Sequence, residues 1–300
     1  MPTPHVLPSA LLTGPFTVAQ ARALGLSPEV LRGQRFWSPF RGVHVSTGVA
    51  DSLHCRCRAL AVAQPDVTFS HLTAARLWQL PVPGRSGRLG MPDDEPLEVT
   101  SADVRLRSRG VWGHRGALGP DEIQVRQGLR LTSGGRTWAD LAGRLGVDDL
   151  VVLGDALLSR GLATLLGLTA QAAQPRRRGA RQMRAVIELL EPRTDSPRET
   201  LLRLLLVRAG LPRPVANRDI VEDGEWLARP DLSYPHLRIA IEYDGEHHQS
   251  DRRQWRRDIS RRRLLEDAGW LLIVVTAEDL KLHPEAIVER VRRAIASRTR

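Results

Sequence analysis

Three hundred residues are enough for about two compact domains, with a third if one of them is small. Hydrophobic residues make up 42% and charged residues 26% of the chain, which excludes a wholly disordered or fibrous protein. The longest uncharged apolar run, Trp270–Ala277, is far shorter than the roughly 20 residues of a membrane-spanning helix, so we expect no membrane segment. No basic segment precedes the first apolar stretch, and we expect a cytoplasmic protein without a secretory signal.

The two cysteines, Cys55 and Cys57, are separated by one residue, a spacing that suits a reducing compartment rather than a structural disulfide. With His54 they would make half of a metal site, but no second pair of ligands follows at zinc spacing. We therefore expect two small buried residues on a helix over 52–63.

The charge of the chain is strongly positive and is carried almost wholly by arginine. Forty-four basic against 34 acidic residues give a net charge of +10, and Lys281 is the one lysine in the sequence. A guanidinium group binds two phosphate oxygens at once, which favours a polyanionic partner such as DNA. A coding sequence rich in G and C would give the same arginine excess without any ligand, so composition leaves both explanations open.

The N-terminal segment shows two short helical patterns followed by a hairpin. Thr17 begins the first helix, which Gly25 ends in the left-handed conformation, and Ser27 followed by Pro28 begins the second. Residues 35–45 carry aromatic and basic side chains and predict a β-hairpin. Two helices joined by a tight turn predict a helix-turn-helix, with the hairpin as its wing.

This segment resembles the N-terminal winged-helix domain of AbiEi-type antitoxins. The resemblance implies DNA as a partner, and a toxin or another product of the same operon as a second one. By position, the residues expected to contact DNA are Arg32, Gln34, Arg35 and Arg41, because the second helix and the wing approach a groove and its phosphates. A winged helix that serves only in packing is the alternative.

Residues 51–195 predict short strands and helices without a recognisable chemical motif. The expected elements are a helix over 71–80 capped by Ser70, strands over 97–100 and 124–132, and a helix over 141–161. Three acids in the last of these, Asp148, Asp149 and Asp155, are expected to face solvent or to cap helix starts.

A further helix start is predicted at Ser196. Serine at the N-cap, Pro197 at the first helical position and Glu199 at the third form a complete capping box before an apolar run that Gly210 ends.

Two apolar strands, over 226–233 and 237–243, follow and are joined by a short turn. A turn centred between positions 236 and 237 places Asp231 directly opposite Glu242, so that both side chains share one sheet face with Cβ atoms ~5 Å apart. Asp244, two residues beyond Glu242, projects from that same face, while Ile239, Ile241 and Tyr243 project from the other face into a core. A shift of the turn by one residue would separate the three carboxylates.

Carboxylates this close to one another raise each other's pKa or share a cation. Oxygen ligands suit Mg²⁺ first and Mn²⁺ second. Such an ion binds a phosphate oxygen and lowers the pKa of a bound water, which is what phosphodiester hydrolysis requires. His247 and His248 come next in the sequence, and one imidazole there can act as base or acid near neutral pH.

An arginine-rich helix is expected over 251–268, ended by Gly269, then a buried strand over 270–276 and an amphipathic helix over 284–296. Strand, helix and strand in this order predict a right-handed parallel crossover. Arg257, Arg261 and Arg262 on the helix are expected to contact DNA, with a solvated face as the alternative.

This arrangement resembles the PD-(D/E)XK, or restriction-endonuclease-like, superfamily, and most closely the endonuclease-domain proteins related to very short patch repair endonucleases. The residues that carry the resemblance are Arg229-Pro230-Asp231, Ile241 to Gly245 with His248, Asp258, Arg262, Gly269-Trp270 and Val275-Thr276. The resemblance implies that Asp231, Glu242 and Asp244 hold the metal. It also implies that His248 is an active-site imidazole and that Glu199 is a further acid borne on a helix.

Two departures from the superfamily pattern bear on activity. The lysine two positions after the second acid is absent, and Asp244 stands in its place. Val274 stands in the last core strand, where this branch often has arginine. Charge stabilisation would then come from the ion, His248 or Arg262.

The sequence thus predicts a multidomain protein of mixed α+β and α/β class. A winged helix-turn-helix-like domain is expected over 1–50, a mixed α/β middle domain over 51–195, and over 196–300 a restriction-endonuclease-like domain with a mixed sheet flanked by helices. We expect a metal-dependent DNA endonuclease using Mg²⁺ or Mn²⁺. The alternative is an AbiEi-like DNA-binding regulator or antitoxin whose nuclease-like domain has lost turnover, as the absent lysine and Val274 favour.

Overall fold

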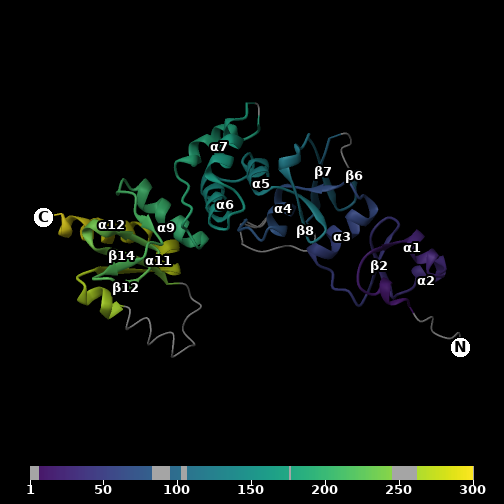
Figure 1. Ribbon diagram of the computed structural model, residues 1–300, viewed down its shortest axis with the longest axis horizontal. Helices are drawn as coiled ribbons and strands as arrows, with labels where there is room; N and C mark the ends of the chain where they lie inside the picture. Colours follow the sequence, from purple (N-terminus) through teal and green to yellow (C-terminus); the bar gives the residue numbers. More distant parts are fainter. Residues whose placement is uncertain (1–6, 83–94, 103–106, 176, 245–261, 300) are drawn as a thin grey trace. The chain divides into compact units, whose positions relative to one another are not determined.

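Figure 1 shows a computed structural model of the chain, which describes residues 7–82, 95–102, 107–175, 177–244 and 262–299. The chain folds into two compact units, residues 1–143 and 144–300. Within the described ranges, no helix combines the length and the apolar character needed to cross a membrane. The three-part division at residues 50 and 195 stays a prediction.

The first unit begins with two helices and a small antiparallel sheet. After a 3-10 turn at Ser9–Leu11, its elements are β1 (Phe16–Thr17), α1 (Val18–Ala23), α2 (Pro28–Leu31), β2 (Phe36–Phe40) and β3 (Val43–Ser46). The strand order is β1-β3-β2. As predicted, Thr17 caps α1, since its hydroxyl accepts the Gln20 N–H at 3.1 Å, and Gly25 ends it with a φ of +80°.

Aromatic and aliphatic side chains from the 3-10 turn, β1, α1, α2 and β2 form one small core. Phe16 and Phe36 meet edge to face with ring centroids 5.5 Å apart, and Leu26 and Leu31 are buried against them. The predicted helices and hairpin are therefore present. The second helix, α2, is a single turn of 4 residues, which limits how many of its side chains can enter a groove.

The rest of the first unit is built on a six-stranded sheet of order β6-β7-β5-β4-β9-β8. Its elements are α3 (Leu53–Ala63), β4 (Thr68–Phe69), α4 (His71–Leu77), β5 (Leu97–Ser101), β6 (Arg107–Ser108), β7 (Val111–Arg115), a 3-10 turn at Pro120–Glu122, β8 (Ile123–Arg126), β9 (Leu129–Thr132) and α5 (Gly134–Leu141). Cys55 and Cys57 are buried on α3, as predicted, and burial raises the pKa of the Cys57 thiol above its ordinary value.

Three details of this region differ from the prediction. The strand expected over 124–132 is the β8–β9 hairpin, with Gln127 and Gly128 in the left-handed conformation at its turn. Ser70 stands at the N-cap of α4, but its hydroxyl bonds Thr100 Oγ1 at 2.8 Å and the His71 ring at 2.9 Å instead of a helix N–H. The helix expected over 141–161 is broken between α5 and the next helix.

The second unit starts with helices, continues into a mixed sheet and ends with two further helices. Its helices are α6 (Val147–Ser159), α7 (Leu165–Ala173), α8 (Ala180–Ile187), α9 (Pro197–Arg208), α11 (Ala277–Leu282) and α12 (Pro284–Arg298). Its strands are β10 (Val215–Ala216), β11 (Ile220–Glu222), β12 (Glu225–Ala228), β13 (Leu232–Tyr234), β14 (Ile239–Asp244) and β15 (Leu271–Thr276). Residues 262–267 are also helical, and Gly269 follows them with a φ of +76°, as expected of a helix end.

The main sheet of this unit has the order β10-β13-β14-β15, with β11 and β12 paired as a separate ribbon. Strands β14 and β15 are parallel, as predicted, and the right-handedness of the connection between them stays a prediction. Helices α9 and α12 cover one face, where Leu202, Leu206, Ile287 and Val291 pack on Ile241 and its neighbours (Figure 1).

Two strand predictions in this unit were wrong. The strand expected over 226–233 is split between the ribbon and the main sheet, because Pro230 has no N–H for a ladder and separates β12 from β13. The strand expected to be buried over 270–276 is the edge strand β15: Ile273 and Val275 are buried on one face, Leu272 and Val274 are half-buried on the other, and Leu271 and Thr276 at its ends are exposed.

Candidate functional site

The predicted pairing of the two acid-bearing strands is confirmed. In the antiparallel ladder of β13 and β14, Leu232 is opposite Ile241 and Ser233 is opposite Ala240. Continued by one residue, this register places Asp231 opposite Glu242, on the face away from the core under α9 and α12. The turn itself is a 3-10 turn over Pro235–Leu237.

The side chain of Asp231 also takes part in the pairing. Its Oδ2 accepts the backbone N–H of Tyr243 at 2.6 Å, just beyond the last ladder pair. The carboxylate is thus fixed by β14 at the position where the two strands diverge. Asp231 and Glu242 are half-buried, whereas Asp244, at the end of β14, is exposed.

A third strand, β10, brings the amide side chain that follows it next to these two acids. In the ladder of β10 and β13, Ala216 is opposite Leu232, and the backbone N–H of Asn217 donates to the Asp231 carbonyl at 3.0 Å. Asn217, Asp231 and Glu242 therefore occupy neighbouring positions at the ends of three adjacent strands, and we call this set the acidic row. Asn217 has a φ of +42°, a conformation that asparagine tolerates better than most residues.

Glu199 joins this row through Asn217. Its Oε2 accepts the Asn217 Nδ2 at 2.7 Å and the Asp195 backbone N–H at 2.9 Å, while Ser196 Oγ accepts the Glu199 N–H at 3.3 Å. The predicted helix start is confirmed. The capping box is not complete as predicted, because the carboxylate reaches the residue before the N-cap and is then available to the neighbouring strand.

A buried ion pair holds the helix that carries Glu199. Asp155, predicted to face solvent, is 1% exposed, and its Oδ2 accepts from Arg203 Nη2 at 2.7 Å and from Thr200 Oγ1 at 2.9 Å. Its Oδ1 accepts the backbone N–H of Glu191 at 2.7 Å. The prediction for Asp155 was wrong because its partners lie far away in the sequence, and the pair fixes α9 on α6.

The fourth strand of the sheet, β15, places an apolar residue next to Glu242. Parallel pairing of β14 and β15 sets Glu242 beside Val274 and Asp244 beside Thr276. The position where the superfamily pattern often has arginine is therefore adjacent to Glu242 and holds a valine.

The three carboxylates share a face without meeting in a tight group. Such a group, with three ligand-type side chains whose donor atoms all lie within 4.8 Å of one another, occurs once within the described ranges, and it is in the first unit.

Several residues named in the sequence analysis lie outside the described residues: Gly245, His247, His248, Arg257 and Arg261. Arg262 is about half exposed, with its Nε 3.6 Å from Glu266 Oε1.

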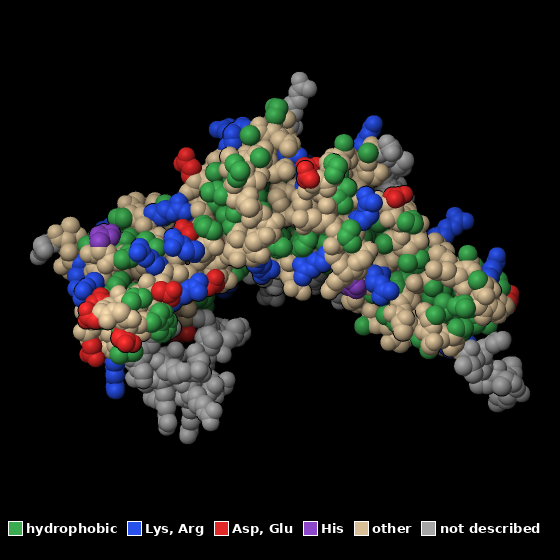
Figure 2. Space-filling view, viewed as in Figure 1, with side chains coloured by type: hydrophobic (Ala, Val, Ile, Leu, Met, Phe, Trp, Pro, Cys, Tyr) green, Lys and Arg blue, Asp and Glu red, His purple; other side chains and the backbone are tan. Residues whose placement is uncertain are grey.

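The residues predicted to contact DNA in the first unit are exposed. They are Arg32, Gln34, Arg35 and Arg41. Arg32 donates to Glu29 at 3.0 Å in a fully solvated pair that a phosphate can replace at little cost. Figure 2 shows arginine and lysine side chains spread over the visible face of both units.

Sequence reasoning missed one residue that supports the acidic row, Asn217, and named a second, Arg229, without giving it a role. Asn217 was overlooked because a single asparagine in a β-rich stretch has no pattern of its own. Arg229, which the family motif includes, donates to the Asn217 carbonyl at 3.1 Å and to Asp195 Oδ2 at 3.2 Å. The proximity of Arg229 to Asp231 in the sequence was the signal that pointed to a supporting role.

Residues 228–295 match the restriction-endonuclease-like family described as REase_MTES_1575, and this supports the nuclease-like superfamily for the C-terminal segment. The chain is also 28% identical over 144 residues to "Uncharacterized protein MT2308" and to "Uncharacterized protein Rv2248", both from strains of Mycobacterium tuberculosis. That alignment covers 48% of this chain and 53% of each relative, so the chain spans about half the length of the curated relatives it matches. No solved structure matches.

Proposed function

We propose that this protein is a metal-dependent DNA endonuclease, with its phosphodiester-cleaving site on β13 and β14 and with DNA held in part by the N-terminal helices and hairpin. The observation that carries the proposal is the register that places Asp231 opposite Glu242 within the segment that matches a nuclease-like family. The Asp231 and Glu242 carboxylates share one sheet face and are flanked by Asn217 and Glu199, whose side chains also carry oxygens, so the site is rich in oxygen donors.

The donor set fits a hard divalent cation. Asp231 uses Oδ2 to hold β14, and its other oxygen, with the Glu242 carboxylate, would hold Mg²⁺ or Mn²⁺. Bound there, such an ion would supply a Lewis acid for a phosphate oxygen and a water of lowered pKa. Asp244 and His248 are further proposed site residues, the first exposed at the end of β14.

The residues of the chain do the positioning. The Tyr243 N–H orients the Asp231 carboxylate, and Asn217 connects β13 to Glu199 at the start of α9. Glu199 is proposed as a positioning residue because its Oε2 is already engaged by two donors. Exposed arginines would bind the phosphates on either side of the scissile bond.

Cleavage of supercoiled plasmid by the purified full chain tests the proposal. We expect nicking with Mg²⁺ or Mn²⁺, loss of nicking with a chelator, and loss by at least about 100-fold in D231N and in E242Q. Asparagine at 231 still accepts the Tyr243 N–H, so the hairpin should remain folded. The matched controls are D223N and E225Q, two exposed acids of the β11–β12 ribbon, which should cleave normally.

A second function, DNA binding without cleavage, is favoured by one observation: Val274 occupies the sheet position beside Glu242. Under this function the protein is a DNA-binding regulator with a nuclease-like scaffold, and a toxin is its expected partner. The test offers plasmid, linear, single-stranded and mismatched DNA to the protein with either metal. If all of them stay intact while a mobility-shift assay still detects DNA binding, this second function replaces the endonuclease proposal.

A further inference from the structure

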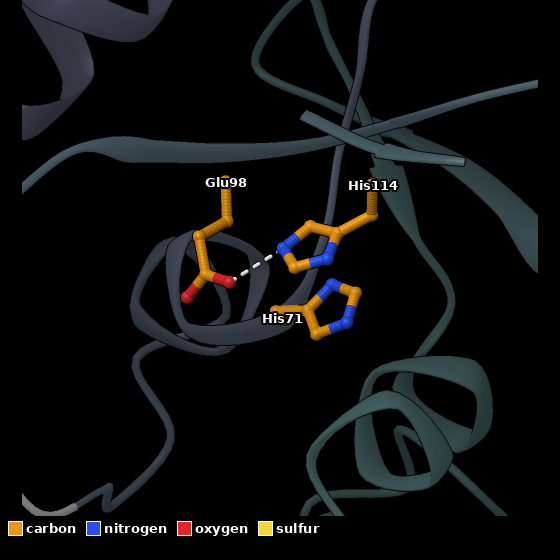
Figure 3. Close-up of side chains that lie close together, drawn as sticks. All are labelled: His71, Glu98 and His114. Carbon is orange, nitrogen blue, oxygen red and sulfur yellow. Dashed lines mark hydrogen bonds and ion pairs between the residues drawn. The ribbon is translucent and has the colours of Figure 1, made fainter. Parts of the chain in front are cut away.

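Two histidines and a glutamate from separate elements converge in the first unit, apart from the acidic row. His71 is the first residue of α4, Glu98 lies on β5 and His114 lies on β7. One ligand atom from each side chain lies within 4.8 Å of the others. Figure 3 shows the carboxylate of Glu98 facing the His114 ring, with the His71 ring beside it.

The sheet register explains why these side chains meet. In the parallel pairing of β5 and β7, Glu98 is beside Trp112 and Thr100 is beside His114, so all four side chains leave the same face. The Ser70 N–H donates to the Glu98 carbonyl at 2.9 Å, and Thr100 Oγ1 donates to Ser70 Oγ at 2.8 Å. These bonds hold the start of α4, and with it His71, over the Glu98–His114 pair.

The carboxylate at the centre is deeply buried. The Glu98 side chain is 3% exposed, and its Oε2 lies 2.7 Å from His114 Nε2. The His71 and His114 rings stack with centroids 3.6 Å apart, and their side chains are 12% and 22% exposed. A buried carboxylate with two imidazoles at this distance is the nitrogen and oxygen donor set that binds a cation of the zinc class.

A second layer of side chains orients His71. Its Nδ1 lies 2.9 Å from Ser70 Oγ and 4.0 Å from Asp140 Oδ2. Arg136 donates to Asp140 Oδ1 at 2.7 Å and to Glu122 Oε2 at 2.9 Å. Although burial favours the neutral guanidine, these two carboxylates raise the pKa of Arg136 above its ordinary value. The Ser70 hydroxyl at Nδ1 is the kind of hydrogen-bond partner that fixes the ring of a metal ligand.

We propose that His71, Glu98 and His114 form a binding site for a divalent transition metal, with Zn²⁺ as the preferred ion. Ligation through His71 Nε2 keeps the contacts of its Nδ1 with Ser70 and Asp140. The ion replaces the hydrogen bond between Glu98 and His114, and three protein ligands leave a fourth position for water. His71 has a φ of +50°, an unfavourable backbone conformation that tends to persist where a side chain must be aimed.

Cobalt replaces zinc in such sites and gives visible absorption bands, so the metal-stripped full chain is titrated with Co²⁺. We expect about one Co²⁺ per chain with the band intensity of a four-coordinate site, displaced by Zn²⁺. The signal should disappear in H114Q and in E98Q. It should be unchanged in H236Q and in D223N, which alter an exposed histidine and an exposed acid of the second unit.

Two further measurements keep the test decisive if H114Q or E98Q fails to fold. X-ray absorption of the zinc-loaded unmodified chain should show scattering from two imidazoles. Trp112, 42% exposed and stacked on His114 at 5.6 Å, should contribute fluorescence that Co²⁺ quenches, and W112F should lose that quenching.

Any one of three results would overturn the proposal. These are the absence of Co²⁺ bands in the unmodified chain, a zinc X-ray absorption spectrum without imidazole scattering, and equal Co²⁺ binding by folded H114Q and the unmodified chain. Those results would leave the histidines and Glu98 as a hydrogen-bonded cluster that supports α4. Since D231N and E242Q act on the other unit, failure here does not bear on the endonuclease proposal.

Discussion

Nδ2 of Asn217 donates a 2.7 Å hydrogen bond to Oε2 of Glu199, and the backbone N–H of the same asparagine donates to the Asp231 carbonyl. The first turn of α9 is thereby connected to the strand that carries the proposed metal ligand. Glu199, 7% exposed, can act on the site either through this support or by binding the cation directly.

The two possible roles of Glu199, supporting the strand and binding the cation, predict different effects of E199Q on cleavage. The effects given next are those expected if Glu199 only supports the strand. Glutamine keeps a carbonyl oxygen for Asn217 and Asp195 but loses the charge, so the free energy of unfolding should fall by about 1 kcal/mol and cleavage by less than about 10-fold. Urea unfolding and plasmid nicking measure the two effects. A loss of cleavage as large as that of D231N, in a variant of normal stability, would show that Glu199 binds metal or substrate.

The ion pair of Asp155 and Arg203 should dominate the stability of the second unit. Both residues are 1% exposed, and Arg203 also donates to the Leu189 carbonyl at 2.7 Å. R203M leaves a charged carboxylate buried beside a methionine, which should lower the free energy of unfolding by about 3–5 kcal/mol. Urea unfolding followed by circular dichroism measures this change.

The control for R203M is R292M, which removes an exposed arginine that donates to Glu289 at 2.9 Å on α12. It should cost less than about 1 kcal/mol, because solvated pairs contribute little. Equal unfolding curves for the two variants would mean that burial of Arg203 does not carry the expected cost.

Local patterns predicted the hairpin face well. The alternation of apolar and acidic residues allows one register that buries Ile239 and Ile241, and this register by itself puts Asp231 beside Glu242. Helix starts at Thr17 and Ser196 were equally predictable, because a cap involves residues within one turn.

Contacts between distant segments were not predictable. Asp155 looked like a solvent-facing acid because its cationic partner is 48 residues away, and His71 and Glu98 were not singled out at all. His71, Glu98 and His114 meet only through the pairing of β5 with β7 and the placement of α4 over them. A single sequence read by itself contains no sign of such long-range pairs. Hydropathy also predicts one continuous strand where Pro230 divides the chain into β12 and β13.

Alkaline pH should destabilise the second unit through Tyr234. Its hydroxyl donates to the Pro212 carbonyl at 2.9 Å, and burial raises the pKa of Tyr234 to about 12. Since this pKa is above the unfolded value of about 10, the associated stabilisation is fully present below pH 10 and is lost as the pH rises through 12. The shift corresponds to about 3 kcal/mol.

The chain has two tyrosines, so Y243F leaves Tyr234 as the one phenol that absorbance at 295 nm reports. Ionisation of the folded variant should begin well above pH 10. In Y234F the free energy of unfolding should change less between pH 10 and 12 than in the unmodified chain. A normal tyrosine titration in folded Y243F would contradict the burial of this side chain.

Binding of DNA by the first unit should depend on salt through its exposed arginines. Arg35 and Arg41 flank β2 at the hairpin, and neither position lies in the hydrophobic core. If each contacts one phosphate, R35A and R41A should each reduce the slope of log Kd against log salt by about 0.9, because one fewer counterion is released. Fluorescence anisotropy with a labelled duplex at several salt concentrations measures these slopes.

Arg292, exposed on α12 and placed in no proposed DNA contact, gives the matched control R292M, which should leave the slope unchanged. The effect of R35A and R41A should also be nearly the same for duplexes of different sequence, since phosphate contacts position a protein without reading bases. Because α2 is a single turn, we expect it to add little base discrimination, and Q34A should change affinity by less than either arginine variant. A slope that none of the N-terminal variants alters would move the DNA-binding surface away from the hairpin and onto the second unit.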